Sequence, residues 1–217
     1  MFGLPQQTVD AALQDLQTAI EQQPTHLSWY QLTIEPNTVF SAKPPVLPDD
    51  DHLWDMQEQG QGCLAEAGYE QYEVSAYARE QQQCSHNLNY WEFGDYLGIG
   101  AGAHGKLTDV AAGTITRYQR HKIPARYMAL AGTEEVITGS RVLKHEDLSL
   151  EFMMNALRLV QGVPARLFNE RTGLLLNRLE KDLTRAEQQG LLDWQVDSLK
   201  PTAKGQRYLN DLLAIFM

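Results

Sequence analysis

The sequence predicts an α/β fold in two parts: a parallel sheet with its helices, then a mostly helical, winged-helix-like C-terminal domain. Up to about residue 80, segments with the apolar spacing of strands and of helices alternate, as they do in βαβ units. From about Asp147 onward the apolar spacing is helical. The charge changes near the same point, because residues 1–150 carry 20 acidic and 9 basic side chains and residues 151–217 carry 8 and 9. A shift of this kind indicates two subregions.

The first part is predicted to alternate strands and helices. In chain order, the predicted elements are the end of a strand at residues 1–5, a helix at 8–22, a strand at 26–34, a helix at 49–67 and a strand at 69–77. Thr8 has the side chain of a helix cap, and Pro24 is a signal that ends the first helix. The order strand, helix, strand predicts parallel pairing.

The second part is predicted to contain several helices and one hairpin. In chain order, the predicted elements are a short helix opened by Pro124, a helix at 147–162, helices at 164–171 and 174–189, a hairpin at 191–200 and a helix at 202–216. This order resembles a winged helix, a fold that often binds DNA. The net charge of residues 151–217 is only +1, so we expect no nucleic-acid partner, although a winged-helix nucleic-acid module remains a third interpretation.

The composition limits the classes of protein that fit. A hydrophobic fraction of 43% supports a globular core, and a net charge of −10 argues against a general binder of phosphate backbones. No apolar run could span a bilayer, and the start lacks signal-peptide architecture, so we expect a cytoplasmic location. Cys63 and Cys84 are the two cysteines. They exclude a disulfide scaffold and a four-thiolate metal site within this chain.

The segment HNLNYW at residues 86–91 combines a histidine, two asparagines and two aromatic side chains. His86 could ligate a haem iron, and Asn87 could fix the tautomer of its ring. Tyr90 and Trp91 offer flat apolar surface for a macrocycle or a base. The alternative is an aromatic-anchored loop whose histidine is satisfied locally, which the segment alone favours slightly.

A glycine-rich run covers residues 98–105, where Gly100, Gly102 and Gly105 match a dinucleotide-binding fingerprint formally. That fingerprint needs a helix directly after the turn, and residues 106–116 do not have a helical pattern. We therefore reject a nicotinamide site. The two remaining interpretations are a strand that lets a neighbouring backbone approach closely and a strand end against which a nucleoside lies.

Basic side chains gather at residues 117–126, where Arg117, Arg120 and Arg126 are the arginines. A guanidinium can bind a carboxylate through two hydrogen bonds, so this cluster could face the carboxylates of a ligand. For any single member, a solvated loop is the simpler interpretation.

Several of these motifs together resemble a known family. The segments that carry the resemblance are MFGLPQQT (1–8), YQLTIEPNTVF (30–40), YEVSAYA (72–78), HNLNYW (86–91), DYLGIGAGAHG (95–105), EFMMNALRL (151–159) and PTAKGQRYLNDLL (201–213). They are similar to the oxygen-independent coproporphyrinogen oxidase-like proteins of the radical SAM superfamily, and most of all to its HemW-type haem chaperones.

The resemblance implies a partial TIM-type barrel, of which residues 1–123 would be the C-terminal portion, followed by a helical domain at residues 124–217. It also implies a [4Fe–4S] cluster on a CxxxCxxC motif with S-adenosylmethionine at its open iron. That motif is absent here. We therefore expect a C-terminal fragment of the family chain, with cluster and S-adenosylmethionine bound only by the full-length protein and no catalysis by this chain.

The resemblance also assigns residues. His86, Asn87, Tyr90 and Trp91 match the HNxxYW motif associated with haem, with His86 as the contact to the haem iron. The run Gly98 to His104 matches a barrel strand beside S-adenosylmethionine, with these residues as the candidates: Ile99, Gly100, Ala101 and His104. Our own addition is that Arg117, Arg120 and Arg126 bind haem propionates.

The function implied by the resemblance is a haem chaperone that delivers haem to apo-haemoproteins such as respiratory enzymes. The alternative is an oxygen-independent coproporphyrinogen III oxidase of porphyrin biosynthesis. We also expect the truncated barrel to expose apolar sheet edges, which favours self-association.

Overall fold

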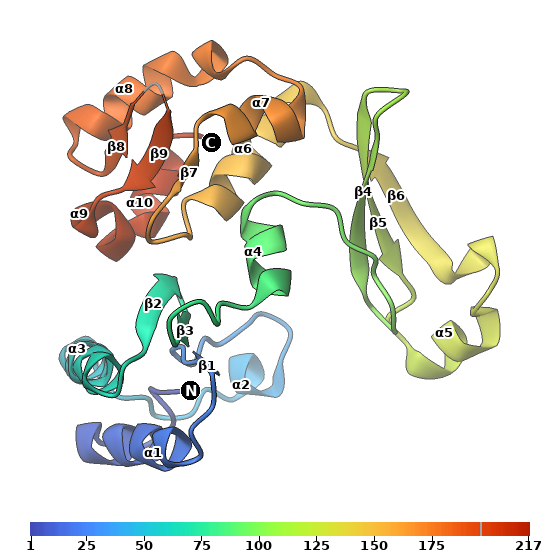
Figure 1. Cartoon of the computed structure of the whole chain (residues 1–217). Helices are drawn as coiled ribbons and strands as arrows, with labels where there is room; N and C mark the ends of the chain where they lie inside the picture. The colour runs from blue at the N-terminus through green and yellow to red at the C-terminus, as the bar shows by residue number, and fades with distance from the viewer. Residues whose placement is uncertain (196) are drawn as a thin grey trace. The chain divides into compact units, whose positions relative to one another are not determined.

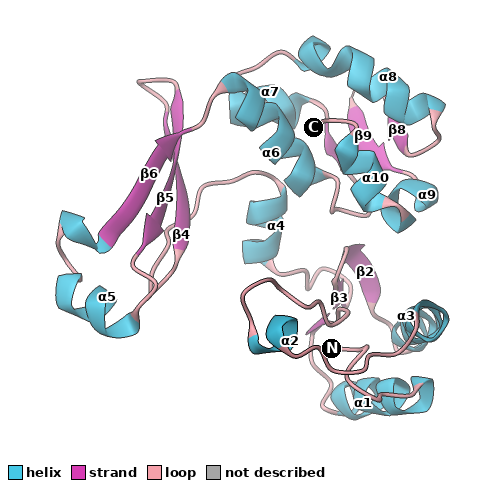
Figure 2. Cartoon of the chain, turned by 180° about the vertical axis from the view of Figure 1, so that it is seen from behind, coloured by secondary structure: helices cyan, strands magenta, loops and turns pink. Residues whose placement is uncertain are grey.

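The computed structural model describes residues 1–195 and 197–217 as helices joined to three small sheets of three strands each (Figures 1 and 2). By its internal contacts the chain divides into two units, Met1–Ser85 and His86–Met217. The boundary expected from the sequence, between residues 123 and 124, stays a prediction.

The first unit contains three helices and one sheet among its described residues. Its elements are α1 (Val9–Glu21), β1 (His26–Ser28), α2 (Val39–Ala42), α3 (Asp50–Glu66), β2 (Glu70–Glu73) and β3 (Ala76–Ala78). The two longer helices confirm the sequence prediction, and so do their caps. The Thr8 hydroxyl accepts a hydrogen bond from the Ala11 amide (3.2 Å), and the Asp49 carboxylate accepts one from the His52 amide (2.9 Å).

The strands of this unit pair differently from the prediction. The sheet order is β1-β3-β2, and both pairings are antiparallel. Parallel pairing occurs at Phe2, whose amide donates to the Tyr30 carbonyl (3.0 Å) and whose carbonyl accepts from the Leu32 amide (2.9 Å). The predicted strand at residues 26–34 is shorter, because β1 ends at Ser28.

The predicted single strand at residues 69–77 is wrong, because the chain turns back between β2 and β3. The buried Glu73 carboxylate holds this turn by accepting hydrogen bonds from the amide (3.1 Å) and the hydroxyl (2.9 Å) of Ser75. The turn contains neither glycine nor proline, so the pattern carried no signal for it.

The core of the first unit forms around Trp29. Its buried members are Phe2, Ala12, Leu16, Trp29, Met56, Leu64, Tyr69 and Tyr77. The Trp29 ring lies 4.4 Å from the Phe2 ring, centroid to centroid. A Cβ atom at Gly60 of α3 would lie 2.0 Å from the Trp29 ring, so the close approach of helix and indole requires glycine there.

The cap of α3 supports a prediction about pH. Nδ1 of His52 lies 2.6 Å from Oδ1 of Asp49, and both side chains are exposed. The hydrogen bond and the charge of Asp49 raise the pKa of His52. A raised pKa means that this pair stabilises the helix start fully below the ordinary value of 6.5 and loses its effect as the pH rises through the folded value. We expect an NMR titration of His52 to have its midpoint above 6.5, and to return toward 6.5 in Asp49→Ala. Equal midpoints in the two proteins would contradict the pairing.

The second unit begins with a short helix and a sheet. Its first elements are α4 (Ser85–Trp91), β4 (His104–Asp109), β5 (Thr114–Arg120), α5 (Pro124–Leu130) and β6 (Ile137–Val142). The sheet order is β4-β5-β6, with antiparallel pairs. All six residues of the edge strand β6 are exposed, which is the kind of edge that favours self-association. The self-association itself stays a prediction.

The rest of the second unit confirms the winged-helix-like order. Its elements are α6 (His145–Ala156), β7 (Val163–Pro164), α7 (Arg166–Thr172), the 3₁₀ helix η2 (Leu176–Leu179), α8 (Glu180–Gln188), β8 (Leu192–Trp194), β9 (Ser198–Pro201), α9 (Ala203–Arg207) and α10 (Leu209–Ala214). The sheet order is β7-β9-β8.

Two predicted helices of this domain are interrupted. The predicted helix at 174–189 is η2 followed by α8, and the one at 202–216 breaks between α9 and α10 at Tyr208. The predicted hairpin is present in β8 and β9, while residue 196 lies outside the described residues. No helix in the described ranges is long and apolar enough to cross a membrane.

Candidate functional site

The HNLNYW motif forms the helix α4 rather than a loop. Helical spacing places His86 and Tyr90 one turn apart, and Asn87 and Trp91 likewise. The His86 and Tyr90 rings lie 4.7 Å apart, centroid to centroid, in an edge-to-face arrangement. His86 is exposed, whereas Asn87, Tyr90 and Trp91 are half-buried. The helix therefore presents the imidazole to solvent and supports it with the Tyr90 ring.

A third aromatic residue, Tyr96, extends this arrangement. Its ring lies 4.2 Å from the Tyr90 ring, so His86, Tyr90 and Tyr96 form one continuous row of rings. We call these three residues the aromatic row. Tyr96 is not among the residues predicted from the sequence, because its aromatic character next to the glycine-rich run was its only signal.

The Tyr90 hydroxyl is held in its neutral form. Burial raises its pKa, and the neighbouring Tyr96 raises it further, while Arg117 acts in the opposite direction. A tyrosine ligates iron as the phenolate, so a raised pKa disfavours that role. The histidine is then the side chain of the aromatic row suited to bind a metal.

Arg117 joins the end of the aromatic row to the C-terminal domain. Its Nη1 donates a hydrogen bond to the Tyr96 hydroxyl (2.5 Å). Its Nε (2.7 Å) and Nη2 (2.6 Å) both contact Oε2 of Glu151 in α6. Burial lowers the pKa of Arg117, but the hydrogen bond and charge of Glu151 raise it by more, so its pKa lies above the ordinary value.

The three predicted arginines do not form one cluster. Arg117 contacts the aromatic row. Arg120 instead donates from Nε to the Gly98 carbonyl, and its guanidinium lies 5.6 Å from the Tyr118 ring centroid. Arg126 is exposed on α5. The structure thus brings one of the three to the motif, and the propionate role of all three stays a prediction.

Trp91 contacts another side chain that was not predicted from the sequence. The guanidinium of Arg158 lies 4.4 Å from the centroid of the Trp91 ring, within the range of a cation–π contact. Nε1 of Trp91 is buried and has no hydrogen-bond partner among the described residues. Arg158 lies 67 positions along the chain from Trp91, so no local pattern links them.

A buried lysine fixes the segment between α4 and β4. Lys106 is 1% exposed, and its Nζ donates to the Phe93 carbonyl (2.8 Å) and to Oδ1 of Asp95 (3.3 Å). Tyr96 and Lys106 exchange two backbone hydrogen bonds, each of 3.0 Å. Burial lowers the pKa of Lys106, and Asp95 offsets part of that effect. The lysine therefore positions the backbone that carries Tyr96.

Asp95 completes this arrangement as an ionised carboxylate. Burial raises its pKa, but hydrogen bonds from the amide and hydroxyl of Thr108 (both 2.8 Å) and the charge of Lys106 outweigh that effect. Its pKa consequently lies below the ordinary value of 3.8.

The glycine-rich run up to residue 103 is a loop and not the expected strand. Residues 98–103 precede β4, which begins at His104. Gly100 and Gly102 have φ values of +112° and +74°, which an extended strand does not allow. Amides of the loop donate to the hydroxyls of Tyr118 (from Gly98, 2.9 Å) and Tyr127 (from Gly100, 3.1 Å).

Most of the residues predicted to lie beside S-adenosylmethionine are exposed. Ile99 is 79% exposed in the loop, and Ala101 and His104 are exposed as well. The rejection of a nicotinamide site agrees with the fold, because the loop leads into the hairpin of β4 and β5 and not into a helix.

The donor set does not fit an iron–sulfur cluster. Cys63 lies in α3 and Cys84 precedes α4, and both thiols are free. Across the described part of the chain, no group of three or more His, Cys, Asp or Glu side chains could hold a metal ion. Such clusters need several cysteine ligands, so these residues do not build one.

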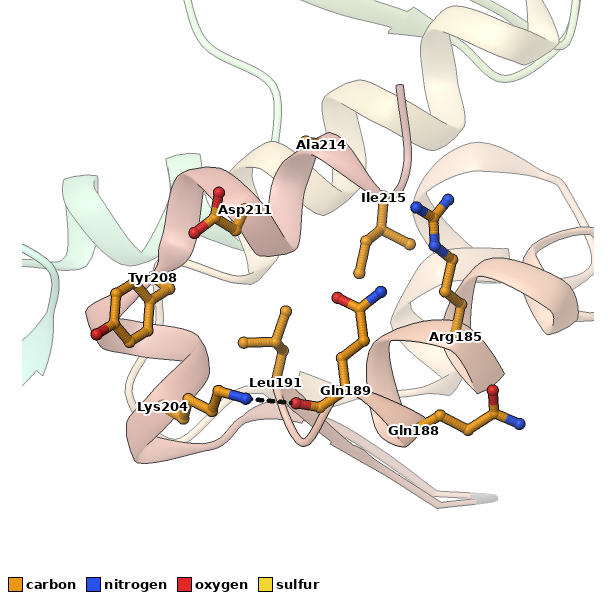
Figure 3. A pocket seen from close by; sticks show the side chains of 9 residues that line it. All are labelled: Arg185, Gln188, Gln189, Leu191, Lys204, Tyr208, Asp211, Ala214 and Ile215. Carbon is orange, nitrogen blue, oxygen red and sulfur yellow. Dashed lines mark hydrogen bonds between the residues drawn. The ribbon is translucent and has the colours of Figure 1, made fainter.

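The C-terminal domain contains a separate groove of about 730 Å³ (Figure 3). The residues that line it are Arg185, Gln188, Gln189, Leu191, Lys204, Tyr208, Asp211, Ala214 and Ile215. Nζ of Lys204 donates to the Gln189 carbonyl (2.8 Å). Its positive charge therefore lies at the C-terminal end of α8, where the helix dipole favours a cation. None of these lining residues belongs to the aromatic row, so the groove is a different surface.

Comparisons with known proteins agree with this architecture. Residues 143–208 match the family model of the HemN C-terminal domain. The whole chain is 49% identical to the heme chaperone HemW of Haemophilus influenzae and 48% identical to that of Escherichia coli. It spans 55% and 56% of these two proteins.

A solved structure matches as well. It is that of coproporphyrinogen III oxidase (HemN) from Escherichia coli, described as a radical SAM enzyme, with a TM-score of 0.74 over 99% of this chain and 53% of that one. At 18% identity this match supports the fold. In its C-terminal part the chain is therefore similar to the HemN C-terminal domain. Over the whole length of the chain, the two relatives named above to which it is similar are heme chaperones of the HemW type.

Proposed function

We propose that this chain supplies the haem-binding surface of a HemW-type chaperone, which binds haem and passes it to apo-haemoproteins in the cytoplasm. The observation that carries the proposal is the aromatic row, which ends in an exposed imidazole on one side and in Arg117 on the other. An imidazole suits the haem iron, aromatic rings suit the porphyrin face, and a guanidinium suits a propionate. Haem is here the cargo.

Each residue of the motif has a place in this proposal. His86 contacts the iron, and Tyr90 with Tyr96 supports the imidazole and one part of the porphyrin. Trp91 packs against the guanidinium of Arg158 and so keeps α4 in position. Asn87 is half-buried on α4 and can orient the histidine.

The radical SAM part of the function belongs to the full-length protein. Residues Ile99, Gly100, Ala101 and His104 remain our candidates for the surface beside S-adenosylmethionine, in a loop that is tied down through Tyr118 and Tyr127. The [4Fe–4S] cluster would be held elsewhere, since the described residues of this chain do not fit it.

The proposal is tested by titrating the purified chain with ferric haem and following the Soret band. We expect a saturable shift at one haem per chain, together with quenching of tryptophan fluorescence because Trp91 lies in the motif. A featureless, non-saturating rise in absorbance, such as haem gives in buffer without protein, would contradict the proposal.

A further inference from the structure

We propose that Glu151 is an internal competitor for the carboxylate-binding side chain Arg117, and that a haem propionate displaces it onto Arg141. The inference rests on the proposed function and adds a specificity-determining residue to it. Glu151 would make binding depend on the carboxylates of the tetrapyrrole and not only on its apolar ring.

The contacts of Arg117 resemble those that a bound carboxylate would make. Oε2 of Glu151 accepts from Nε and Nη2 of Arg117, which is the donor pair that a guanidinium offers to a carboxylate. The remaining nitrogen, Nη1, donates to Tyr96 in the aromatic row. A carboxylate attached to a ring that lies on this row would thus arrive where Glu151 now binds.

Both partners of this ion pair are partly accessible. The side chains of Arg117 and Glu151 are 29% and 17% exposed, so a ligand can reach the pair without unfolding the sheet or α6. Two carboxylates at one guanidinium repel each other, so the ligand carboxylate and Glu151 compete for Arg117.

A second arginine provides a place for Glu151 to go. Oε1 of Glu151 lies 3.4 Å from Nη2 of Arg141, and Nη1 of Arg141 lies 3.3 Å from Asp147. The Arg141 side chain is 61% exposed and can move with its partner. When a ligand takes Arg117, Glu151 keeps a cation beside it, and no half-buried carboxylate is left without a counter-charge.

The competition predicts opposite effects of two substitutions. Glu151→Gln removes the competing charge, and we expect it to tighten ferric haem binding about tenfold, the size of one charge-assisted hydrogen bond. Arg141→Gln removes the alternative partner, so Glu151 stays on Arg117 and haem binding weakens by about threefold, the size of a surface ion pair. Arg141 is exposed, so this second variant keeps its fold.

The matched control is Asp147→Asn, which removes the same charge from the same helix. Asp147 contacts Arg141 but not Arg117, and its capping contact with the Lys144 amide (3.0 Å) can be kept by asparagine. We expect its affinity for haem to stay within about twofold of the unmodified chain, since it pairs at the surface.

The probe that isolates the carboxylate is haem dimethyl ester, which has the same ring and iron without the free propionates. We expect Glu151→Gln to leave the affinity for the ester unchanged. Equal tightening of haem and ester, or an unchanged affinity for haem in both Glu151→Gln and Arg141→Gln, would overturn the inference while haem binding itself stands. Failure of the unmodified chain to bind either compound would overturn the proposed function and the inference with it.

Discussion

Replacing His86 with alanine is expected to weaken haem binding by at least 10- to 100-fold, the loss that removing even an outer-shell partner of a metal ligand causes. The imidazole is exposed and stands against the Tyr90 ring. The raised pKa of Tyr90 keeps its hydroxyl protonated, so it does not replace the lost ligand. The measurement is a Soret titration of both proteins, in which the variant should also lose the band position of a histidine-ligated haem.

His145→Ala is the matched control for this experiment. His145 is also an exposed histidine at the start of a helix, α6, but it does not belong to the aromatic row. We expect it to bind haem as the unmodified chain does. Equal affinities of the His86→Ala variant and the unmodified chain would remove His86 from the site, and a loss in both variants would indicate binding through surface histidines in general.

The parts of the fold that could be predicted are those with local signals. The helices α1 and α3 carry an apolar stripe behind a capping residue, Thr8 or Asp49, and the structure shows both caps. The winged-helix-like order followed from the spacing of apolar residues and from the glycines that end helices, such as Gly190 with φ +69° after α8.

The parts that could not be predicted depend on side chains far apart in the sequence. The turn between β2 and β3 is held by the buried side chain of Glu73. From the sequence alone an acidic residue is expected at the solvent-exposed face of a strand. The helical state of HNLNYW was not expected either, because six residues are too few to show a helical period.

The site shows the same division. Composition identified a histidine, aromatic rings and arginines, which are the side chains that the structure brings together in His86, Tyr90 and Arg117. Sequence proximity wrongly grouped Arg117 with Arg120, because the two arginines, three positions apart on β5, contact different partners. Glu151 contacts the site from α6, 34 positions beyond Arg117, and only the tertiary fold reveals it.

The same helix α6 carries the residue with the largest expected effect on stability. Phe152 is fully buried, and its ring stands edge-to-face against both Phe93 (5.9 Å between centroids) and Phe168 (5.2 Å). Phe152→Ala removes the central ring of these three phenylalanines, and we expect the free energy of unfolding of the second unit to fall by about 3–5 kcal/mol. Phe152→Leu leaves a smaller cavity and should cost less, roughly 1–2 kcal/mol.

The effect on stability is separable from a local change at the surface of α6. Met154→Ala is the control, since Met154 is 46% exposed on the same helix and alanine is a good helix former, so a change within about 0.5 kcal/mol is expected. Hydrogen exchange at the amides of α6 and α7 measures the loss of stability, with α1 and α3 of the first unit as the internal reference.

The same substitution should also affect haem binding. The Phe93 carbonyl accepts the Lys106 hydrogen bond that positions Tyr96, so removing the Phe152 ring should weaken haem binding at temperatures where the unit is still folded. Unchanged exchange in α6 and α7 of Phe152→Ala would show that the three phenylalanines do not hold this unit together.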